Sequence, residues 1–528
     1  MTDGHTVVDC ARHGHLPSLF GCLGSLALVL NIARWWMGQT VSASEDTMTS
    51  VVAAPAAVRA DEGEIYDVVI VGAGVAGMST AQKLIEQGKS VVLIEARDRC
   101  GGRVQPVDVK GTRVDLGAQF IHGVSKPNPL MQLLNGLGQD HKVHKVDWDD
   151  GYYYKGDGAA GEVPDGKLDQ SYKLSEKALN TVRSKRGSIY KKQTREADLS
   201  LGEELRGVVA AMKSKNKSMD SELVMLCAQM EISDDYAADL DELSLCYWDQ
   251  DDEFNGCDGI IRKEGYAPLL AALSKGLNIV LNQPVASIQQ VSAKDGHHEG
   301  VCVTCSSGAQ FRGQQVVCTL PLGVLKSRTV RFDPALPPSL AESVDRLGVG
   351  NLEKLVIKFK QPFWPNDSDC FFNLSGNPFR LWLNVGNCYG HGDRTMLLCF
   401  VAGSYARSLM SSASDDDIIN LGLGSLREIF GSSRIPTDTA RAMSLVDTAR
   451  VTRWCTDPWS QGSYSHMPRG SLPADYDAFG KRYWDGRLHF AGEGTFRKFP
   501  GTVHGALLSG ERAARNCAGG GAPRKKKA

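Results

Sequence analysis

YDVVIVGAGVAGMSTAQKLIEQGKSVVLIEARDRCGGR, residues 66–103, is the stretch that decides the fold of this chain. Tyr66 to Val71 is a short apolar run of the kind that forms a buried parallel strand. Three glycines follow in a G-x-G-x-x-G pattern, just where a helical pattern begins: Gly72, Gly74 and Gly77. A second apolar run, Ser90 to Ile94, completes a strand, turn, helix and strand. This unit is typical of a dinucleotide site.

Each glycine has its own expected role at such a site. Gly72 permits the tight turn, Gly74 lets the backbone approach the pyrophosphate, and Gly77 lets the helix pack closely on the strand. N–H groups at the helix N-terminus, that of Ala76 among them, would face the phosphates. Glu95 is placed to accept hydrogen bonds from ribose hydroxyls, which favours FAD or NAD because a carboxylate repels the extra phosphate of NADP. A glycine-rich surface turn is the alternative interpretation.

The continuation of this stretch separates FAD from NAD. It contains Arg97, Gly101, Gly102 and Arg103, and a second glycine pair with an arginine suits a second backbone approach to the pyrophosphate. Here the residues also carry a family resemblance. EARDRCGGR, from Glu95, and DLGAQFIHG, from Asp115, together resemble the flavin-containing amine oxidases, which include polyamine oxidases, monoamine oxidases and flavin-dependent histone lysine demethylases.

The far end of the chain carries the same resemblance. LHFAGEGTFRKFPGTVHGALLSGERAA, Leu488 to Ala514, is similar to the closing FAD segment of that family, in which a second strand-turn-helix meets the flavin ring. The resemblance covers about Ile65 to Cys517. It implies an α/β fold with a discontinuous Rossmann-type FAD-binding domain and a mixed α+β substrate-binding domain.

The resemblance implies FAD bound without a covalent link. Ser463 stands where some monoamine oxidases carry a flavin-linked cysteine, and a serine cannot form that thioether. Val285 would contact adenine through its backbone alone, so a buried strand valine is an equally good interpretation. The expected cofactor-binding residues are Gly72, Gly74, Ala76, Gly77, Glu95, Arg97, Gly102, Arg103, Gln119, Phe120, Val285, Trp454, Gly492, Glu493, Thr502 and Val503.

Three residues are expected by resemblance to serve the chemistry. Lys354, in GNLEK, matches the family's lysine that holds a water near flavin N5 and helps flavin reoxidation or imine hydrolysis. Tyr464, in DPWSQGSYS, matches the aromatic wall beside the flavin. His122, in FIHG, is expected to hydrogen-bond a substrate nitrogen. As isolated features they are equally a surface lysine, a core tyrosine and a structural turn histidine.

Alternating helix and strand patterns predict a chain that crosses between two domains. GYAPLLAALSKGL reads as a helix, whereas NIVLNQPVASIQQV, FRGQQVVCTL, VIKFKQPFW and MLLCFVAG read as strands. We expect a leader at 1–62, FAD-domain parts at 63–123, 259–330 and 482–518, substrate-domain parts at 124–258 and 331–481, and a basic flexible tail at 519–528.

The charge and the cysteine content of the chain limit which kinds of partner and ligand are expected. The chain has 528 residues, 42% of them hydrophobic, and a net charge of −2, so no nucleic-acid partner is expected. Its 14 cysteines are scattered, and the one C-x-x-C, Cys302 and Cys305, lacks a second pair, so no metal is expected. Residues 231–258 hold eleven carboxylates and no Lys or Arg. Such a cluster would attract a polycation, unless it is only a solvated helix and loop.

Two sets of motifs point to different substrates. FIHG and Trp248 to Tyr266 resemble polyamine oxidases, whereas GNLEK, DPWSQGSYS and TVHGALLSG resemble chromatin demethylases, whose added helical domain and coiled-coil arm have no counterpart here. We expect a polyamine oxidase that converts a secondary amine of spermine, spermidine or an acetylated derivative, with O2, to an aldehyde, a shorter amine and H2O2. The alternatives are a flavin-dependent lysine demethylase and a noncatalytic FAD-fold binding or escort protein.

The two ends of the chain leave its location open. An apolar run, Leu16 to Ala33, resembles a signal peptide or the front of an organelle-targeting leader, with a signal anchor or a translation start at Met48 as alternatives. We expect the secretory pathway or an organelle, with the cytoplasm or nucleus as alternatives, and membrane contact only if this run is retained. The basic run Arg524 to Lys527 reads as a solvated tail, a nuclear address or a retrieval signal.

Overall fold

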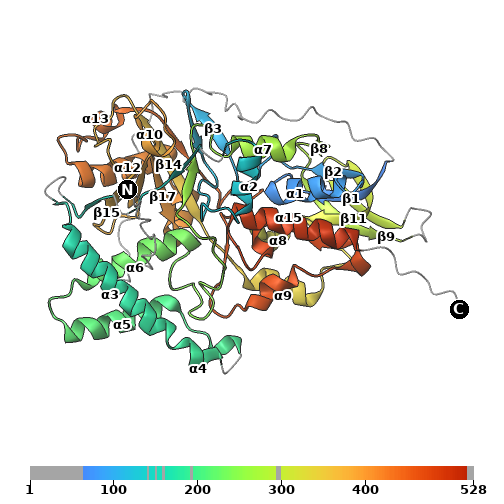
Figure 1. The fold of residues 1–528 in the computed structure, drawn as a ribbon, viewed down its shortest axis with the longest axis horizontal. Coiled ribbons are helices and arrows are strands. Elements are labelled where there is room, and N and C mark those ends of the chain that lie inside the picture. Colours follow the sequence, from blue (N-terminus) through green and yellow to red (C-terminus); the bar gives the residue numbers. More distant parts are fainter. Residues whose placement is uncertain are drawn as a thin grey trace, which may run out of the picture.

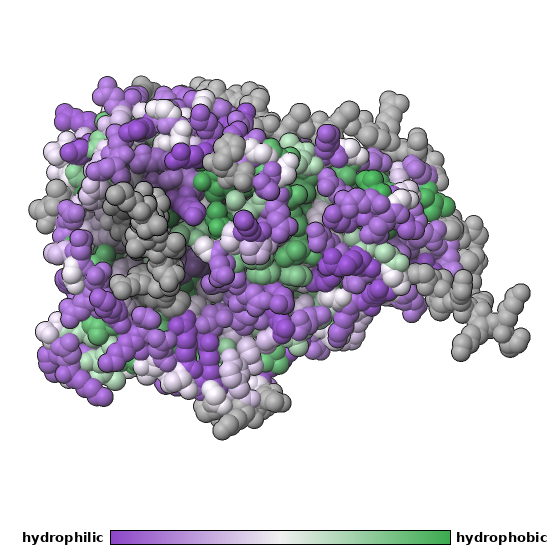
Figure 2. Space-filling view, viewed as in Figure 1, coloured by the Kyte–Doolittle hydropathy of each residue, from purple (hydrophilic) through white to green (hydrophobic). Residues whose placement is uncertain are grey.

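The structure, a computed structural model, describes residues 64–139, 142–148, 151–156, 161–190, 194–292 and 299–519. Two large sheets lie toward opposite ends of the long axis (Figure 1). The expected leader and nearly all of the expected tail lie outside the described residues. Among the described residues, no helix has the length and apolar character needed to cross a membrane. Hydrophilic side chains cover most of the face in Figure 2.

The first sheet is built around β1 (Ile65–Val71), which pairs in parallel with β2 (Val91–Ile94) and β11 (Gln310–Cys318). β20 (Leu488–Phe490) joins β11 in parallel and so brings the late segment beside the early one. The strand order is β12-β9-β10-β11-β1-β2-β8. The remaining strands are β8 (Ile279–Val280), β9 (Val285–Val291), β10 (Gly300–Cys305) and β12 (Arg331–Asp333).

Helices cover both faces of this sheet. On one face α1 (Val75–Ile85) packs against α15 (Val503–Ala518), where a Cβ at Gly510 would lie 2.4 Å from the Ala76 carbonyl oxygen. Only glycine therefore allows this close crossing. The same apolar core includes α2 (Pro129–Gly136) and α7 (Ala267–Ser274). The core of the other face includes α8 (Leu322–Ser327), α9 (Pro338–Arg346) and α14 (Pro473–Ala478).

The second sheet has the order β18-β14-β17-β16-β15-β6 and is antiparallel except between β15 and β6. Alternate side chains of β14 (Leu352–Phe359) enter different cores. Leu355 and Ile357 pack with α12 (Asp415–Phe430), and Val356 packs toward α3 (Asp165–Arg183) and α6 (Ser221–Tyr236). This alternation is expected for a strand buried on both faces. Its strands are β6 (Tyr152–Tyr154), β14 (Leu352–Phe359), β15 (Cys370–Asn373), β16 (Leu381–Asn384), β17 (Met396–Ala402) and β18 (Val446–Val451).

Two groups of helices flank the second sheet (Figure 1). The first is α3 (Asp165–Arg183), α4 (Arg186–Tyr190), α5 (Leu201–Lys215) and α6 (Ser221–Tyr236). The second is α10 (Val385–Cys388), α11 (Gly403–Ser412), α12 (Asp415–Phe430) and α13 (Thr439–Met443). The other paired strands form short two-stranded sheets: β3 (Pro106–Val109) with β4 (Thr112–Asp115), β5 (Val143–Lys145) with β7 (Gly259–Ile261), and β13 (Gly348–Val349) with β19 (Ser465–His466).

The expected α/β fold with two parts is confirmed. The chain passes between the parts repeatedly, as the discontinuous domain requires. β12, at 331–333, still pairs with β9 of the first sheet, just past the boundary expected at 330. The other domain boundaries stay a prediction.

Candidate functional site

The turn between β1 and α1 is shaped to receive a ligand. A Cβ at Gly72 would lie 2.5 Å from Thr319 Oγ1, and one at Gly77 would lie 2.0 Å from the Gly72 carbonyl oxygen. Gly74 differs, because its nearest neighbour would be the Gly101 carbonyl oxygen at 4.0 Å. No side chain caps the N-terminus of α1. An uncapped helix N-terminus behind open backbone fits a pyrophosphate.

Glu95 closes the loop at the end of β2. Its Oε2 accepts from the Ala73 N–H at 2.8 Å, and its Oε1 accepts from the Arg97 N–H at 2.9 Å. Burial raises the pKa of Glu95, and these two hydrogen bonds oppose that rise. Each oxygen keeps a lone pair for a further donor, such as a ribose hydroxyl.

Arg97 pairs with a residue that sequence analysis did not single out. Its guanidinium makes two hydrogen bonds of 2.8 Å with the carboxylate of Asp457. Burial raises the pKa of Asp457, but Arg97 outweighs this and holds it below its usual value. Arg97 also lies 5.9 Å from the ring of Trp454. A cleft of 590 Å³ opens beside these three residues and is lined also by Trp459.

Arg103 joins the early and late segments through Glu493. Its NH1 donates to Glu493 Oε1 at 2.7 Å and to the Ser463 carbonyl oxygen at 2.8 Å. Glu493 Oε2 accepts from Ser465 Oγ at 2.7 Å and from the Gly501 N–H at 2.9 Å. Burial raises the pKa of Glu493, but Arg103 and Ser465 bring it below its usual value. The carboxylate is therefore ionised and joins the early segment, β19 and the turn before α15.

The expected cofactor residues Gly492, Thr502, Val503 and Val285 differ in how much free space lies beside them and in their contacts. A Cβ at Gly492 would meet nothing within 4 Å, so its backbone faces open space. Thr502 caps α15 by accepting from the Gly505 N–H at 3.0 Å, and Val503 is the first residue of that helix. Val285 begins β9 and is half-buried. Its backbone role stays a prediction.

Lys354 lies deep in the structure, so the surface interpretation is wrong. Its Nζ donates to the carbonyl oxygens of Asp115 at 2.7 Å and Gly117 at 2.8 Å, and to Gln119 Oε1 at 2.7 Å. The residue is 3% exposed. Burial lowers the pKa of Lys354, and the nearby Asp115 carboxylate opposes this shift. Nζ also lies 5.4 Å from the ring centroid of Phe400.

A row of aromatic rings leads from Lys354 to His122. The Phe120 ring lies 6.0 Å from Phe400 and 6.1 Å from His122. It also lies 5.6 Å from Trp148. Aromatic walls of this kind exclude water and favour a cation or amine along their faces. Phe120 therefore connects Phe400, which lies beside Lys354, with His122 and Trp148.

His122 ends this row among carboxylates. Its Nδ1 lies 3.0 Å from Asp258 Oδ1, and its side chain is 49% exposed. Burial lowers the pKa of His122, but the carboxylates of Asp258, Asp235 and Glu253 together raise it to about 9. His122 is therefore a cation at neutral pH, stabilised by these three carboxylates.

Tyr464 links the late glycine-rich turn to the acidic segment. Its hydroxyl donates to the Asp234 carbonyl oxygen at 2.7 Å, near the end of α6. Its ring rests against Gly501, whose added Cβ would lie 3.2 Å from Tyr464 Cδ2. The tyrosine thus connects the turn before α15 with the helix that carries Asp234 and Asp235.

The acidic segment is more than a solvated surface stripe. Burial raises the pKa of Asp234, and it raises that of Asp251 to about 6. Neighbouring carboxylates act in the same direction on the pKa values of Asp235 and Asp251. Crowded carboxylates gain when a cation arrives, because it relieves their mutual repulsion.

Trp454 and Ser463 have internal partners. Trp454 Nε1 donates to the Leu116 carbonyl oxygen at 3.1 Å, and its backbone N–H donates to Glu353 at 2.9 Å. Ser463 Oγ donates to the Leu352 carbonyl oxygen at 2.8 Å and accepts from the Leu352 N–H at 2.7 Å. Both residues therefore fix the start of β14, the strand that carries Lys354.

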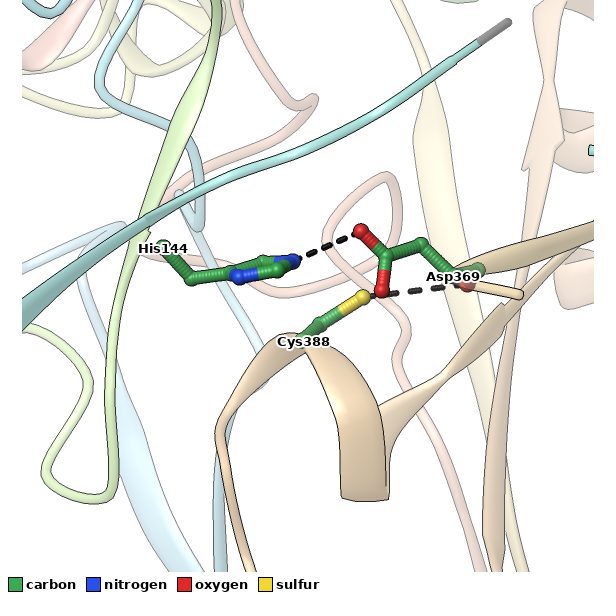
Figure 3. Close-up of side chains that lie close together, drawn as sticks. All are labelled: His144, Asp369 and Cys388. Carbon is green, nitrogen blue, oxygen red and sulfur yellow. Dashed lines mark hydrogen bonds and ion pairs between the residues drawn. The ribbon is translucent and has the colours of Figure 1, made fainter. Parts of the chain in front are cut away.

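A separate group could in principle hold a metal ion: His144, Asp369 and Cys388 (Figure 3). His144 Nε2 lies 2.6 Å from Asp369 Oδ2, and Arg262 donates to His144 Nδ1 at 3.2 Å. Since the arginine can only donate, Nδ1 accepts and Nε2 carries the proton. A metal on Nε2 would displace that proton beside a fixed guanidinium. The group is better explained as a tie between β5, β15 and α10.

Sequence reasoning missed the partners more often than the residues themselves. Asp115, Asp457 and Glu353 were not singled out, although each receives hydrogen bonds that hold an expected site residue. Asp115 accepts from the Tyr266 N–H at 3.1 Å and from the Tyr389 hydroxyl at 3.0 Å. Only its place in DLGAQFIHG, directly before the expected cofactor residues, was a signal.

The site and fold agree with a known family. Residues 75–518 match the family of flavin containing amine oxidoreductases, and the chain belongs to that family. Its cofactor is FAD, and the residues around Gly74, Glu95 and Gly492 fit such a group. The resemblance seen in the sequence is thereby confirmed.

Several curated plant proteins are similar in sequence. "Lysine-specific histone demethylase 1 homolog 3" of Oryza sativa subsp. indica is 34% identical over 465 residues, which cover 85% of this chain and 53% of that protein. "Lysine-specific histone demethylase 1 homolog 2" of Oryza sativa subsp. japonica is 35% identical over 85% of this chain and 56% of its own length. The chain spans about half the length of these relatives.

Solved structures of putrescine oxidase share the fold. The wild-type enzyme bound to putrescine aligns with a TM-score of 0.63 at 20% identity, covering 86% of this chain and 99% of that one. A triple mutant of the same enzyme aligns with a TM-score of 0.65. At this identity the likeness defines the fold alone.

Proposed function

We propose that this protein is an FAD-dependent amine oxidase that acts on a methylated lysine of a basic peptide. One observation carries the proposal: a buried lysine and an acidic opening are joined by a row of aromatic rings. Lys354 lies at the buried end, and His122, 49% exposed, lies at the open end. A cationic chain would enter past the carboxylates and place its reacting nitrogen in the aromatic part.

The relatives support the peptide substrate over the polyamine first expected. The absence of a coiled-coil arm does not weigh against demethylation. The 465-residue alignment with the rice protein covers 85% of this chain and leaves no room for a long arm within the aligned part of that relative. The exposed rim supports a peptide as well, since Asp235, Asp252 and Glu253 are spread over an open surface.

FAD, when bound, supplies the acceptor for the hydride that leaves the N-methyl carbon, and O2 then takes both electrons to become H2O2. The aromatic row of Phe120 and Phe400 would keep the free-base amine dry and oriented. The substrate imine that results takes up water and separates into formaldehyde and the demethylated lysine. Lys354, held by three acceptors, would keep its amino group in one position beside the reacting atoms.

A free polyamine is the second candidate. FIHG and the segment from Trp248 to Tyr266 favour it by resemblance, and the acidic opening would attract spermine equally well. Oxidation of a secondary amine would then give an aldehyde and a shorter amine. A histone substrate would place the protein in the nucleus, which is one of the alternative locations.

Anaerobic mixing of the purified holoprotein with single amines distinguishes these candidates. The loss of visible flavin absorbance is followed with a dimethyl-lysine peptide, spermine, spermidine and N-acetylated polyamines. The proposal expects the fastest loss with the peptide, and formaldehyde on reoxidation. Loss with a polyamine alone would support the second candidate, and no loss with any of them would support a noncatalytic role.

A further inference from the structure

The side chain of Gln119 has an unusual arrangement of hydrogen bonds. Its Oε1 accepts from Lys354 Nζ at 2.7 Å. A lysine ammonium has only donors, so the oxygen must face it and the amide nitrogen must face away. Gln119 is 3% exposed, and its Nε2 finds no acceptor within the described part of the chain. Buried amide groups are rarely left in this state, which points to a missing partner.

The backbone places this amide between the dinucleotide loop and Lys354. The Ala118 N–H donates to the Arg103 carbonyl oxygen at 3.0 Å. A Cβ at Gly117 would lie 1.8 Å from that same oxygen. The segment before Gln119 thus runs against the GGR loop that is expected to approach the pyrophosphate. Gln119 extends from this segment to the buried lysine.

Lys354 has no donor left over for a further group. Its three ammonium N–H groups match the three acceptors that surround it, Asp115, Gly117 and Gln119. The resemblance leads one to expect a water on this lysine. Here the amide oxygen of Gln119 accepts the third N–H of Lys354. The group that can still donate to a ligand is therefore the amide nitrogen of Gln119.

We propose that Gln119 is a positioning residue that fixes Lys354 through Oε1 and donates through Nε2 to an acceptor atom on the edge of the bound flavin. The proposal rests on the proposed function only in placing Lys354 beside the flavin. The acceptor would be a carbonyl oxygen of the flavin, because N5 gains a hydrogen on reduction whereas the carbonyl oxygens gain negative charge. A donor there stabilises the reduced form more and raises the midpoint potential.

Two variants of the holoprotein test this. Gln119→Met keeps the length of the side chain but removes both the acceptor and the donor. Gln119→Glu keeps an acceptor for Lys354, removes the donor and adds a negative charge. We expect both to shift the visible absorption bands of bound flavin and to lower its midpoint potential, the glutamate variant by more.

Gln82→Met is the matched control. Gln82 donates to the carbonyl oxygens of Ala272 and Leu273, both at 2.9 Å, and so holds α1 to α7 away from Lys354. Its loss should leave the absorption bands and the potential unchanged. The flavin content of each variant is measured first, from the ratio of visible to ultraviolet absorbance. The potential is measured by chemical reduction without any amine, so the result stands whichever amine is oxidised.

Two outcomes would overturn the proposal. An unchanged spectrum and potential in Gln119→Met, together with weaker amine binding, would assign the donor to the substrate. No change in any of these would leave the amide a purely structural role. If Gln119→Met does not fold, Gln119→Glu decides, because a midpoint potential equal to that of the wild type contradicts a donor at the flavin edge.

Discussion

The two ends of the proposed substrate path differ in the groups that surround them. At Lys354 the partners are two backbone carbonyls and one buried amide, and the residue is 3% exposed. At His122 the partners are carboxylate side chains, and the side chain is 49% exposed. Backbone partners fix a geometry, whereas charged side chains attract a ligand over a distance. The first end is suited to chemistry and the second to recognition.

The largest expected effect is on turnover at the buried end. Lys354→Met should retain FAD and lower kcat by about a hundredfold, since the positioned ammonium group is lost. KM should change little. Lys358→Met, on the same strand, is the control: its Nζ contacts Asp393 and Thr112 outside the path. Equal turnover of wild type and Lys354→Met would remove this lysine from the site.

A smaller effect is expected on binding at the open end. Asp258→Asn removes a carboxylate and should raise KM for a cationic substrate about tenfold, a change worth about 1.4 kcal/mol. It should leave kcat nearly unchanged. Asp345→Asn, at an exposed ion pair with Arg328, is the control and should alter neither value. A fall in kcat with constant KM would contradict the division between the two ends.

Ionic strength should also affect substrate binding at the open end of the path. Raising salt from about 0.05 M to 0.5 M shortens the reach of charges, so KM for the peptide should rise severalfold while kcat holds. Asp235→Asn should flatten this dependence, because fewer carboxylates attract the substrate. Steady-state rates at a series of salt concentrations measure it. A KM that does not change with salt concentration would mean that the acidic segment does not attract the substrate.

The smallest expected effect concerns stability. Because the pKa of His122 is raised to about 9, the folded state binds more protons than the unfolded state between pH 6.5 and 9. Its contribution to stability is complete below pH 6.5 and is lost as pH rises through 9. In His122→Gln the Tm should fall less over this range than in the wild type. Parallel curves would show that His122 is not held by the carboxylates.

The glycine turn and the late FAD segment could be predicted because their constraints are local. Gly72 and Gly77 are required by contacts within a few residues or with the adjoining strand, and the G-x-G-x-x-G pattern records that requirement. Strand β20 was predicted to return to the first domain, and it pairs with β11. The family resemblance placed Lys354 in the site before its contacts were known.

The partners of these residues could not be predicted in the same way. Arg97 meets Asp457, and Lys354 meets Gln119, across more than two hundred positions of sequence. No periodicity in a single sequence encodes such pairs. The acidic segment shows the same limit. Its composition can be read from the sequence, but the burial that raises the pKa of Asp234 comes from the packing of α6.

The most direct test of the account compares kcat and KM among three proteins, wild type, Lys354→Met and Asp258→Asn, with the amine that bleaches the flavin fastest. All three are first shown to hold equal amounts of FAD. The account predicts that the lysine variant loses kcat with KM nearly constant, and that the aspartate variant gains KM with kcat nearly constant. Variants that change both constants alike would contradict separate chemical and recognition ends.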